Sequence, residues 1–242
     1  MAHPSPASTE AISPTGVRNA VLLTLAGIAV MFYATWLVFF WVPTEALQGV
    51  IQRIFYVHVP AAWIAEMAFA ITALLSAMYL WLRDDRLDAA AVAAAEGGIF
   101  FAMILLIVGP LWGKVAWGAY WQWEEPRLVF TLLLFFIFIG YFMVRGAARQ
   151  PESGKKYAAV IAIVGALDIP LIHMSVYWFR SLHPEPVVMR PDGPTADIEM
   201  LVTLLVGLLA YTMVFFGLFY LRYVVERMER RSANAHLVPA EA

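Results

Sequence analysis

The sequence predicts an all-α, polytopic membrane protein with six transmembrane helices and both termini on the same side. Of its 242 residues, 62% are hydrophobic and only 14% are charged, whereas a soluble domain carries about 25% charged residues. The apolar residues also gather in six runs, each near the roughly 20 residues that a helix needs to cross a hydrocarbon layer about 30 Å thick. Most of the protein surface is therefore expected to face lipid.

The six runs have few ionisable residues, and they occupy residues 20–41, 59–82, 89–111, 128–144, 157–179 and 200–221. The second contains Glu66 and the third contains Glu96, whereas the first, fourth and sixth are uncharged. The fifth is the least regular, because Asp168, Pro170 and His173 lie in its middle. No basic partner for the three acids is expected within the spans.

The orientation follows from the distribution of lysine and arginine, which are concentrated in cytoplasmic loops. Eleven lie on the side of the N-terminus: Arg18, Arg83, Arg86, Arg145, Arg149, Lys155, Lys156, Arg222, Arg227, Arg230 and Arg231. Five lie on the other side: Arg53, Lys114, Arg127, Arg180 and Arg190. This asymmetry predicts cytoplasmic termini and three outer loops, at residues 42–58, 112–127 and 180–199.

The predicted organisation is a single membrane domain, residues 20–225, between a disordered cytoplasmic tail at 1–19 and a second cytoplasmic tail at 226–242. The polar N-terminus, rich in proline and serine, differs from the basic start of a signal peptide. The chain has no cysteine, which excludes disulfides, iron–sulfur clusters and thiolate zinc sites. It also lacks a phosphate-binding glycine loop, so we do not expect it to bind ATP.

The first outer loop contains an amphipathic pattern. Ile51, Ile54, Phe55 and His58 recur at the i, i+3, i+4 and i+7 spacing of one helix face. This predicts a helix lying flat on the membrane and ending at Pro60. His58 by itself is compatible with an ordinary interfacial histidine whose ring is hydrogen-bonded.

The second outer loop is rich in aromatic residues, with Trp112, Trp117, Tyr120, Trp121 and Trp123 falling within twelve residues. As a helix or as a strand, this segment would present a broad aromatic surface followed by an acid. Tryptophan and tyrosine gather at membrane interfaces in general, but a belt of that kind accounts poorly for so many in one loop. Packing against a large flat ligand is the better explanation.

The third outer loop contains His183, which Pro184 excludes from helical geometry. Arginines at positions 53, 127 and 180 also lie on the outer side. A haem requires axial nitrogen ligands, an apolar surface for its faces, and cations for its two propionates. Two histidines, a tryptophan-rich segment and several arginines together favour a haem site.

Three segments resemble signature motifs of the CcmC family, the haem-handling subunit of the cytochrome c maturation system. They are "QRIFYVHVPAAW", "WGKVAWGAYWQWEEPRL" and "WFRSLHPEP". The resemblance implies a protein of the bacterial inner membrane that binds haem b non-covalently at the outer face. It further implies transfer of haem to a membrane-anchored, CcmE-like haem chaperone. CcmA-like and CcmB-like transporter subunits and a small CcmD-like single-span subunit are the other implied partners.

The resemblance also implies roles for individual residues. His58 and His183 match the axial ligands, and Arg53 and Arg127 match basic positions, with Arg180 as a further candidate for the propionates. The tryptophan motif corresponds to Trp117, Trp121 and Trp123, and Trp112 precedes it. Where the family has Trp-Asp followed closely by Arg, this chain has "WEEPR". The acid is therefore Glu124 or Glu125, and Glu124 is the residue included in the predicted site.

Three alternatives share some of these features. A haem-delivering subunit of a cytochrome c synthase has a similar tryptophan motif but usually carries additional spans or a large partner domain. A b-type cytochrome would have pairs of histidines within its spans, where this chain has only His173. A plain transporter would use Glu66, Glu96 and Asp168 as an ion path. No pair of nucleophile and base is apparent, so we do not expect an enzyme.

Overall fold

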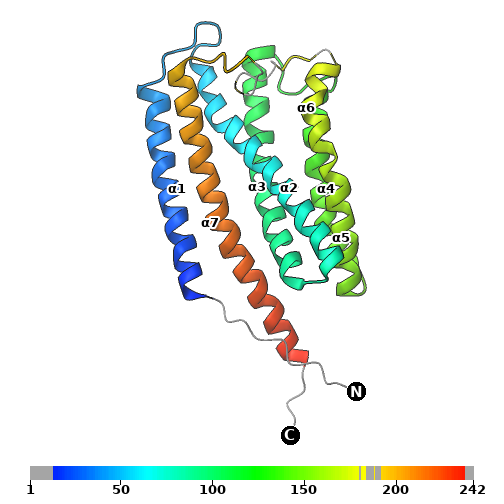
Figure 1. The fold of residues 1–242 in the computed structure, drawn as a ribbon. Helices are drawn as coiled ribbons and strands as arrows, with labels where there is room; N and C mark the ends of the chain where they lie inside the picture. Colours follow the sequence, from blue (N-terminus) through cyan, green and yellow to red (C-terminus); the bar gives the residue numbers. More distant parts are fainter. Residues whose placement is uncertain (1–12, 180, 184–187, 189–191, 238–242) are drawn as a thin grey trace.

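The structure is a computed structural model that describes residues 13–179, 181–183, 188 and 192–237. In these residues the chain is helical and contains no strand. The helices run alongside one another as a bundle, and α1 begins at the same end of the bundle at which α7 ends (Figure 1). We call this the proximal end, and the opposite end, which holds the three long loops, the distal end.

The described residues form six helical segments that are long and apolar enough to cross a membrane. The elements are α1 (Pro14–Phe40), the short 3-10 helix η1 (Val50–Ile54), α2 (Phe55–Leu82), α3 (Asp85–Trp117), α4 (Pro126–Ala147), α5 (Pro151–Ala166), α6 (Asp168–Trp178) and α7 (Ile198–Leu237). Helices α5 and α6 together make the fifth span. The prediction of an all-α, six-span protein is confirmed.

The prediction of a surface helix that ends at Pro60 in the first outer loop was wrong. Only the 3-10 helix η1 precedes α2, and α2 continues through Pro60 instead of starting after it. Pro60 is the sixth residue of α2, so its missing N–H removes only one hydrogen bond close to the helix start. His58 consequently lies in the first turns of a transmembrane helix.

Several helices extend beyond the expected spans. Helix α1 begins at Pro14 with Ser13 as its N-cap, inside the segment predicted as a disordered tail, and residues 1–12 lie outside the described part. Helix α3 continues to Trp117, and the left-handed conformation of Gly118 (φ 80°) then ends it. Helix α7 has 40 residues, about 60 Å at 1.5 Å per residue, and so extends into the predicted C-terminal tail.

Close helix packing depends on small residues. A side chain at Gly27 would place its Cβ 2.9 Å from the backbone nitrogen of Val214, so glycine is what allows α1 to approach α7. Helices α2 and α3 pack against each other, and a Cβ atom at Gly98 of α3 would lie 3.3 Å from the Cβ atom of the fully buried Ala68 of α2. Because lipid tails are as apolar as leucine, such close backbone approach is a main source of helix association in membranes.

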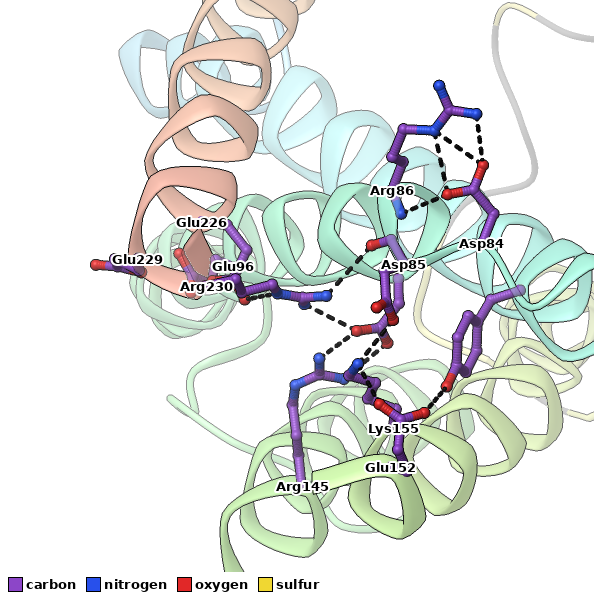
Figure 2. Close-up of polar contacts among 12 residues, drawn as sticks. Asp84, Asp85, Arg86, Glu96, Arg145, Glu152, Lys155, Glu226, Glu229 and Arg230 are labelled. Atoms are coloured by element: carbon purple, nitrogen blue, oxygen red, sulfur yellow. Dashed lines mark hydrogen bonds and ion pairs between the residues drawn. The ribbon is translucent and has the colours of Figure 1, made fainter. Parts of the chain in front are cut away.

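A network of charged residues joins the helices at the proximal end (Figure 2). Its centre is Asp88 of α3, whose side chain is only 3% exposed. Asp88 receives two hydrogen bonds from Arg145 of α4, one of them 2.9 Å long, and one of 2.8 Å from Arg230 of α7. At the rim of the network, Lys155 of α5 pairs with Asp85 at 2.7 Å. Four helices are thereby connected.

The expectation that the intramembrane acids lack basic partners was wrong for two of the three. Glu96 receives hydrogen bonds of 2.5 and 2.8 Å from Arg222 of α7, and Glu66 lies 2.7 Å from the Nε2 atom of His173. These partners come from helices more than a hundred residues away in sequence. Asp168 is buried, and its carboxylate has no partner among the described residues.

Replacing Asp88 by Asn should destabilise the protein by about 3 kcal/mol, because the partly buried Arg145 would lose its carboxylate partner and Arg230 would keep only Glu226. The measurement is the midpoint of denaturation of the purified protein in detergent, followed by circular dichroism. The matched control is Asp85→Asn, which removes a pair with a 66% exposed carboxylate and should cost less than about 1 kcal/mol. Equal effects of the two substitutions would contradict the central role of Asp88.

Candidate functional site

The predicted site residues come from segments that meet at the distal end of the bundle. His58 lies near the start of α2, Trp112 and Trp117 lie in the last turns of α3, and Arg127 lies in the first turn of α4. His183 follows α6 in the third loop. These segments are far apart in the sequence, and the up-and-down order of the helices brings their ends together (Figure 1).

His58 packs against the distal end of α3. Its ring meets that of Trp112 edge to face, with centroids 5.5 Å apart and an interplanar angle of 79°. A Cβ atom at Gly109 would lie 3.2 Å from the Cε1 atom of His58, so the backbone of α3 forms one wall of its pocket. The Nδ1 atom is buried and has no hydrogen-bond partner among the described residues.

Loop residues fix the position of Trp112. Its indole N–H donates a 2.9 Å hydrogen bond to the side-chain oxygen of Gln48 in the first outer loop. That loop is itself ordered by Glu45, whose carboxylate accepts hydrogen bonds from the backbone N–H groups of Leu47 and Gln48. Trp112, which packs against His58, is therefore held both by helix α3 and by the first outer loop.

His183 packs against a second tryptophan of α3, Trp117, which lies five residues beyond Trp112. Its ring meets Trp117 with centroids 4.9 Å apart and an interplanar angle of 67°. His183 and His58 lie close enough for an electrostatic interaction, and each of them also interacts with the charge of Arg127. The structure thus places each predicted histidine against its own tryptophan, with Arg127 within electrostatic range of both.

Glu125 fixes the conformation around His183. Its carboxylate accepts hydrogen bonds from the Ser181 hydroxyl at 2.5 Å and from the Leu182 backbone N–H at 2.7 Å, and it contacts the Nδ1 atom of His183 at 3.2 Å. Glu125 is only 2% exposed. It precedes α4 but makes no side-chain hydrogen bond to the start of that helix, because its oxygens serve the third loop instead.

The charge states of Glu125 and His183 follow from this arrangement. Burial raises the pKa of the Glu125 carboxyl, but the hydrogen bonds from Ser181 and Leu182 and the nearby His183 outweigh burial and leave the pKa below its usual value. Burial lowers the pKa of His183, and the charge of Arg127 lowers it further, while Glu125 opposes both. At neutral pH, His183 is therefore a neutral imidazole, the form that coordinates metals.

Arg127 lies in an unusual position for a cation. It is the second residue of α4, where the helix dipole favours negative charge. No carboxylate of the described residues forms an ion pair with its guanidinium group, although its backbone carbonyl accepts a hydrogen bond from Thr131. An anionic ligand group would satisfy both the guanidinium group and the helix N-terminus.

The remaining members of the tryptophan motif lie in the loop between α3 and α4. Trp121 and Trp123 meet edge to face, with centroids 5.5 Å apart and an interplanar angle of 67°. The segment is neither the helix nor the strand considered from sequence, and its rings do not form one flat surface. Trp121 is partly buried with an unpaired indole N–H, Trp123 is 69% exposed, and Glu124 is also exposed.

The other two predicted arginines differ from Arg127. Arg53 of η1 lies over the ring of Phe39 in α1, 5.5 Å from its centroid, and its buried Nε atom has no hydrogen-bond partner among the described residues. Arg53 therefore lies at the distal end of the bundle, next to α1. Arg180 lies outside the described residues.

His173 is separate from the pair formed by His58 and His183. It lies in α6, and its Nε2 atom is engaged by Glu66 of α2. Pro170 does break the fifth span, which divides at Leu167 into α5 and α6. Glu66 of the second span therefore serves His173 in the fifth span.

This geometry suits a metal that is already coordinated by a cofactor, because the protein offers only two nitrogen ligands. No group of three or more His, Cys, Asp or Glu side chains that could hold a bare metal ion occurs in the described part of the chain. A porphyrin supplies four equatorial nitrogens to its iron, so that two imidazoles complete the coordination. The edge-on tryptophans beside each histidine provide apolar walls, and Arg127 provides a partner for a carboxylate.

Comparisons with known proteins identify the family of the chain. The family model described as "Heme exporter protein C" (CcmC) matches residues 4–238. The chain belongs to the CcmC family. It is 34% identical to heme exporter protein C of Bradyrhizobium diazoefficiens over 82% of this chain and 75% of that protein. Its identity to heme exporter protein C of Paracoccus denitrificans is 30%, over 92% of this chain and 89% of the relative.

Sequence reasoning missed two features of this CcmC-family site. Glu125 was identified only as an alternative to Glu124, and Ser181 was not identified at all. The signal for Glu125 was present in the sequence, because Pro126 favours the first position of a helix and so places Glu125 at the junction between loop and helix. Nothing in the sequence indicated that its carboxylate would turn toward residues 181–183.

Proposed function

We propose that this CcmC-family protein binds haem b non-covalently between His58 and His183 and passes it to a membrane-anchored haem chaperone for cytochrome c maturation. The names of its relatives support haem handling. The observation that carries the assignment of the ligands is the pairing of each histidine with its own α3 tryptophan, Trp112 or Trp117, within electrostatic range of Arg127. The side chains bind and orient haem, and we propose no catalytic step.

Unpaired polar atoms support the proposed cargo. The Nε atom of Arg53 and the indole N–H of Trp121 are both buried without a partner in the described residues. Buried polar groups are almost always paired in folded proteins, so these two donors among predicted site residues indicate a ligand with acceptor groups. The propionates of haem are such groups.

The ion pairs within the spans weaken the transporter alternative. A continuous ion path requires acids that are free to bind a cation, but Glu96 is neutralised by Arg222 and Glu66 contacts His173. The b-type cytochrome alternative is weakened in the same way, because the Nε2 atom of His173 is occupied by Glu66. The haem-delivering subunit of a cytochrome c synthase remains the nearest alternative.

The proposed location is the bacterial inner membrane, with the distal end on the periplasmic side and both termini in the cytoplasm. The distal loops would then present haem to a CcmE-like chaperone. CcmA-like, CcmB-like and CcmD-like subunits would complete the assembly, as the family resemblance implies.

Replacing either His58 or His183 by Ala should remove one axial imidazole and shift the visible spectrum of the haem-loaded protein. Added imidazole should partly restore the spectrum by filling the vacant position. His173→Ala is the matched control, because that ring is engaged by Glu66, and its spectrum should stay unchanged. Loss of the spectrum in His173→Ala, with His183→Ala intact, would overturn the assignment of the ligands.

Arg127→Gln should weaken haem retention without changing the coordination of the iron. A charge-assisted hydrogen bond contributes about 1.5–3 kcal/mol, so haem should be lost roughly 10–150 times faster to a soluble haem-binding protein. Arg53→Gln, at the α1 side of the surface, should have a smaller effect. A changed Soret position in Arg127→Gln would instead indicate that this residue shapes the axial geometry.

The topology can be tested with epitope tags inserted after Gly193 and fused to the C-terminus. In intact spheroplasts, the tag after Gly193 should be accessible to antibody and the C-terminal tag should become accessible only after permeabilisation. Accessibility of both tags from the same side would refute the proposed orientation.

A further inference from the structure

The two proposed axial ligands differ in how their second ring nitrogen is held. The Nδ1 atom of His183 contacts the Glu125 carboxylate at 3.2 Å, whereas the Nδ1 atom of His58 is buried without a partner among the described residues. Each ring is edge-on to an α3 tryptophan, although His58 lies in α2 and His183 in a loop. The two histidines therefore share an aromatic contact and differ in their hydrogen bonding.

A carboxylate behind a coordinating histidine strengthens the metal bond. When Nε2 binds iron, the ring proton resides on Nδ1, and a carboxylate that accepts this proton in a hydrogen bond fixes the ring and raises the basicity of Nε2. Glu125 is buried, and Ser181 and Leu182 already hold its carboxylate in place. His183 is consequently presented to the iron in a preset orientation.

Coordination by His58 has the opposite consequence. Binding of iron at Nε2 forces the proton onto Nδ1, which faces the α3 backbone near Gly109 and finds no acceptor there among the described residues. A buried donor without an acceptor is unfavourable. The bond from His58 to iron is weakened by this cost, whereas that from His183 is strengthened.

We propose, building on the proposed function, that haem is held asymmetrically: Glu125 makes His183 the retained ligand, and His58 is the ligand that leaves first during transfer. In this step the bond between the iron and the Nε2 atom of His58 breaks. A nitrogen donor of the recipient then occupies the vacated axial position. His58 departs as a neutral imidazole, and neither the oxidation state of the iron nor the number of protons changes.

The experiment uses the full-length protein, purified in detergent and loaded with haem b, in the variants His58→Ala and His183→Ala. In the ferrous state each variant retains one histidine, and resonance Raman spectroscopy reports the stretching frequency of its iron–nitrogen bond. The frequency should be higher in His58→Ala, which retains His183. Haem should also leave His183→Ala roughly 10–100 times faster than His58→Ala, the range typical for loss of a supporting carboxylate.

Substitution of Glu125 by Gln isolates the cause of the asymmetry. Combined with His58→Ala, it should lower the stretching frequency, and combined with His183→Ala it should leave the frequency unchanged. The matched control is Asp192→Asn, since Asp192 is an exposed acid of the third outer loop, and it should shift neither. If Glu125→Gln proved unable to fold, the comparison of the two histidine variants would still decide the question.

The outcomes separate the two proposals. Equal frequencies and equal rates of haem loss in the two histidine variants would overturn the asymmetry while leaving haem binding intact. A shift of both frequencies by Glu125→Gln would also overturn it. Failure of the unsubstituted protein to form a six-coordinate haem complex would refute the proposed function itself.

Discussion

The buried carboxylate of Asp88 is the constraint on which the arrangement of the helices depends. A charge removed from water is costly unless it is fully paired. Asp88 of α3 is paired with Arg145 of α4 and Arg230 of α7, so both helices have to lie next to α3. Three helices are thus fixed at the proximal end, and Lys155 adds α5 through Asp85. Because these helices run side by side to the distal end (Figure 1), the network also constrains where their distal ends lie.

The proposed haem site is assembled from those distal ends. His58 and Arg127 lie in first turns and Trp112 and Trp117 in last turns, so the side chains have rigid supports. Only His183 lies in a loop, and there Glu125 supplies the fixed geometry that a helix would otherwise give. The site therefore combines rigid helix ends with one loop held by a buried carboxylate, and that carboxylate is what distinguishes the two histidines.

Predictions about the spans succeeded because lipid imposes a simple rule on composition and length. The six runs are long and uncharged enough to be recognised one at a time, without knowledge of their neighbours. The boundaries were less accurate, as Pro60 and Trp112 show. Proline was taken as a boundary, yet it is tolerated near a helix start, and α3 continues past its apolar run to Trp117 because Gly118 ends it.

The sequence by itself determined the fold class, the number of spans and the types of residue at the site, because hydropathy, aromatic clustering and the Pro-flanked histidines are local properties. Only the tertiary structure decided the partners: Glu125 for His183, Glu66 for His173, and Arg222 for Glu96. Those pairs join residues 58 to 126 positions apart. Their formation depends on which helices are neighbours and how they are rotated, and these properties arise from packing between segments.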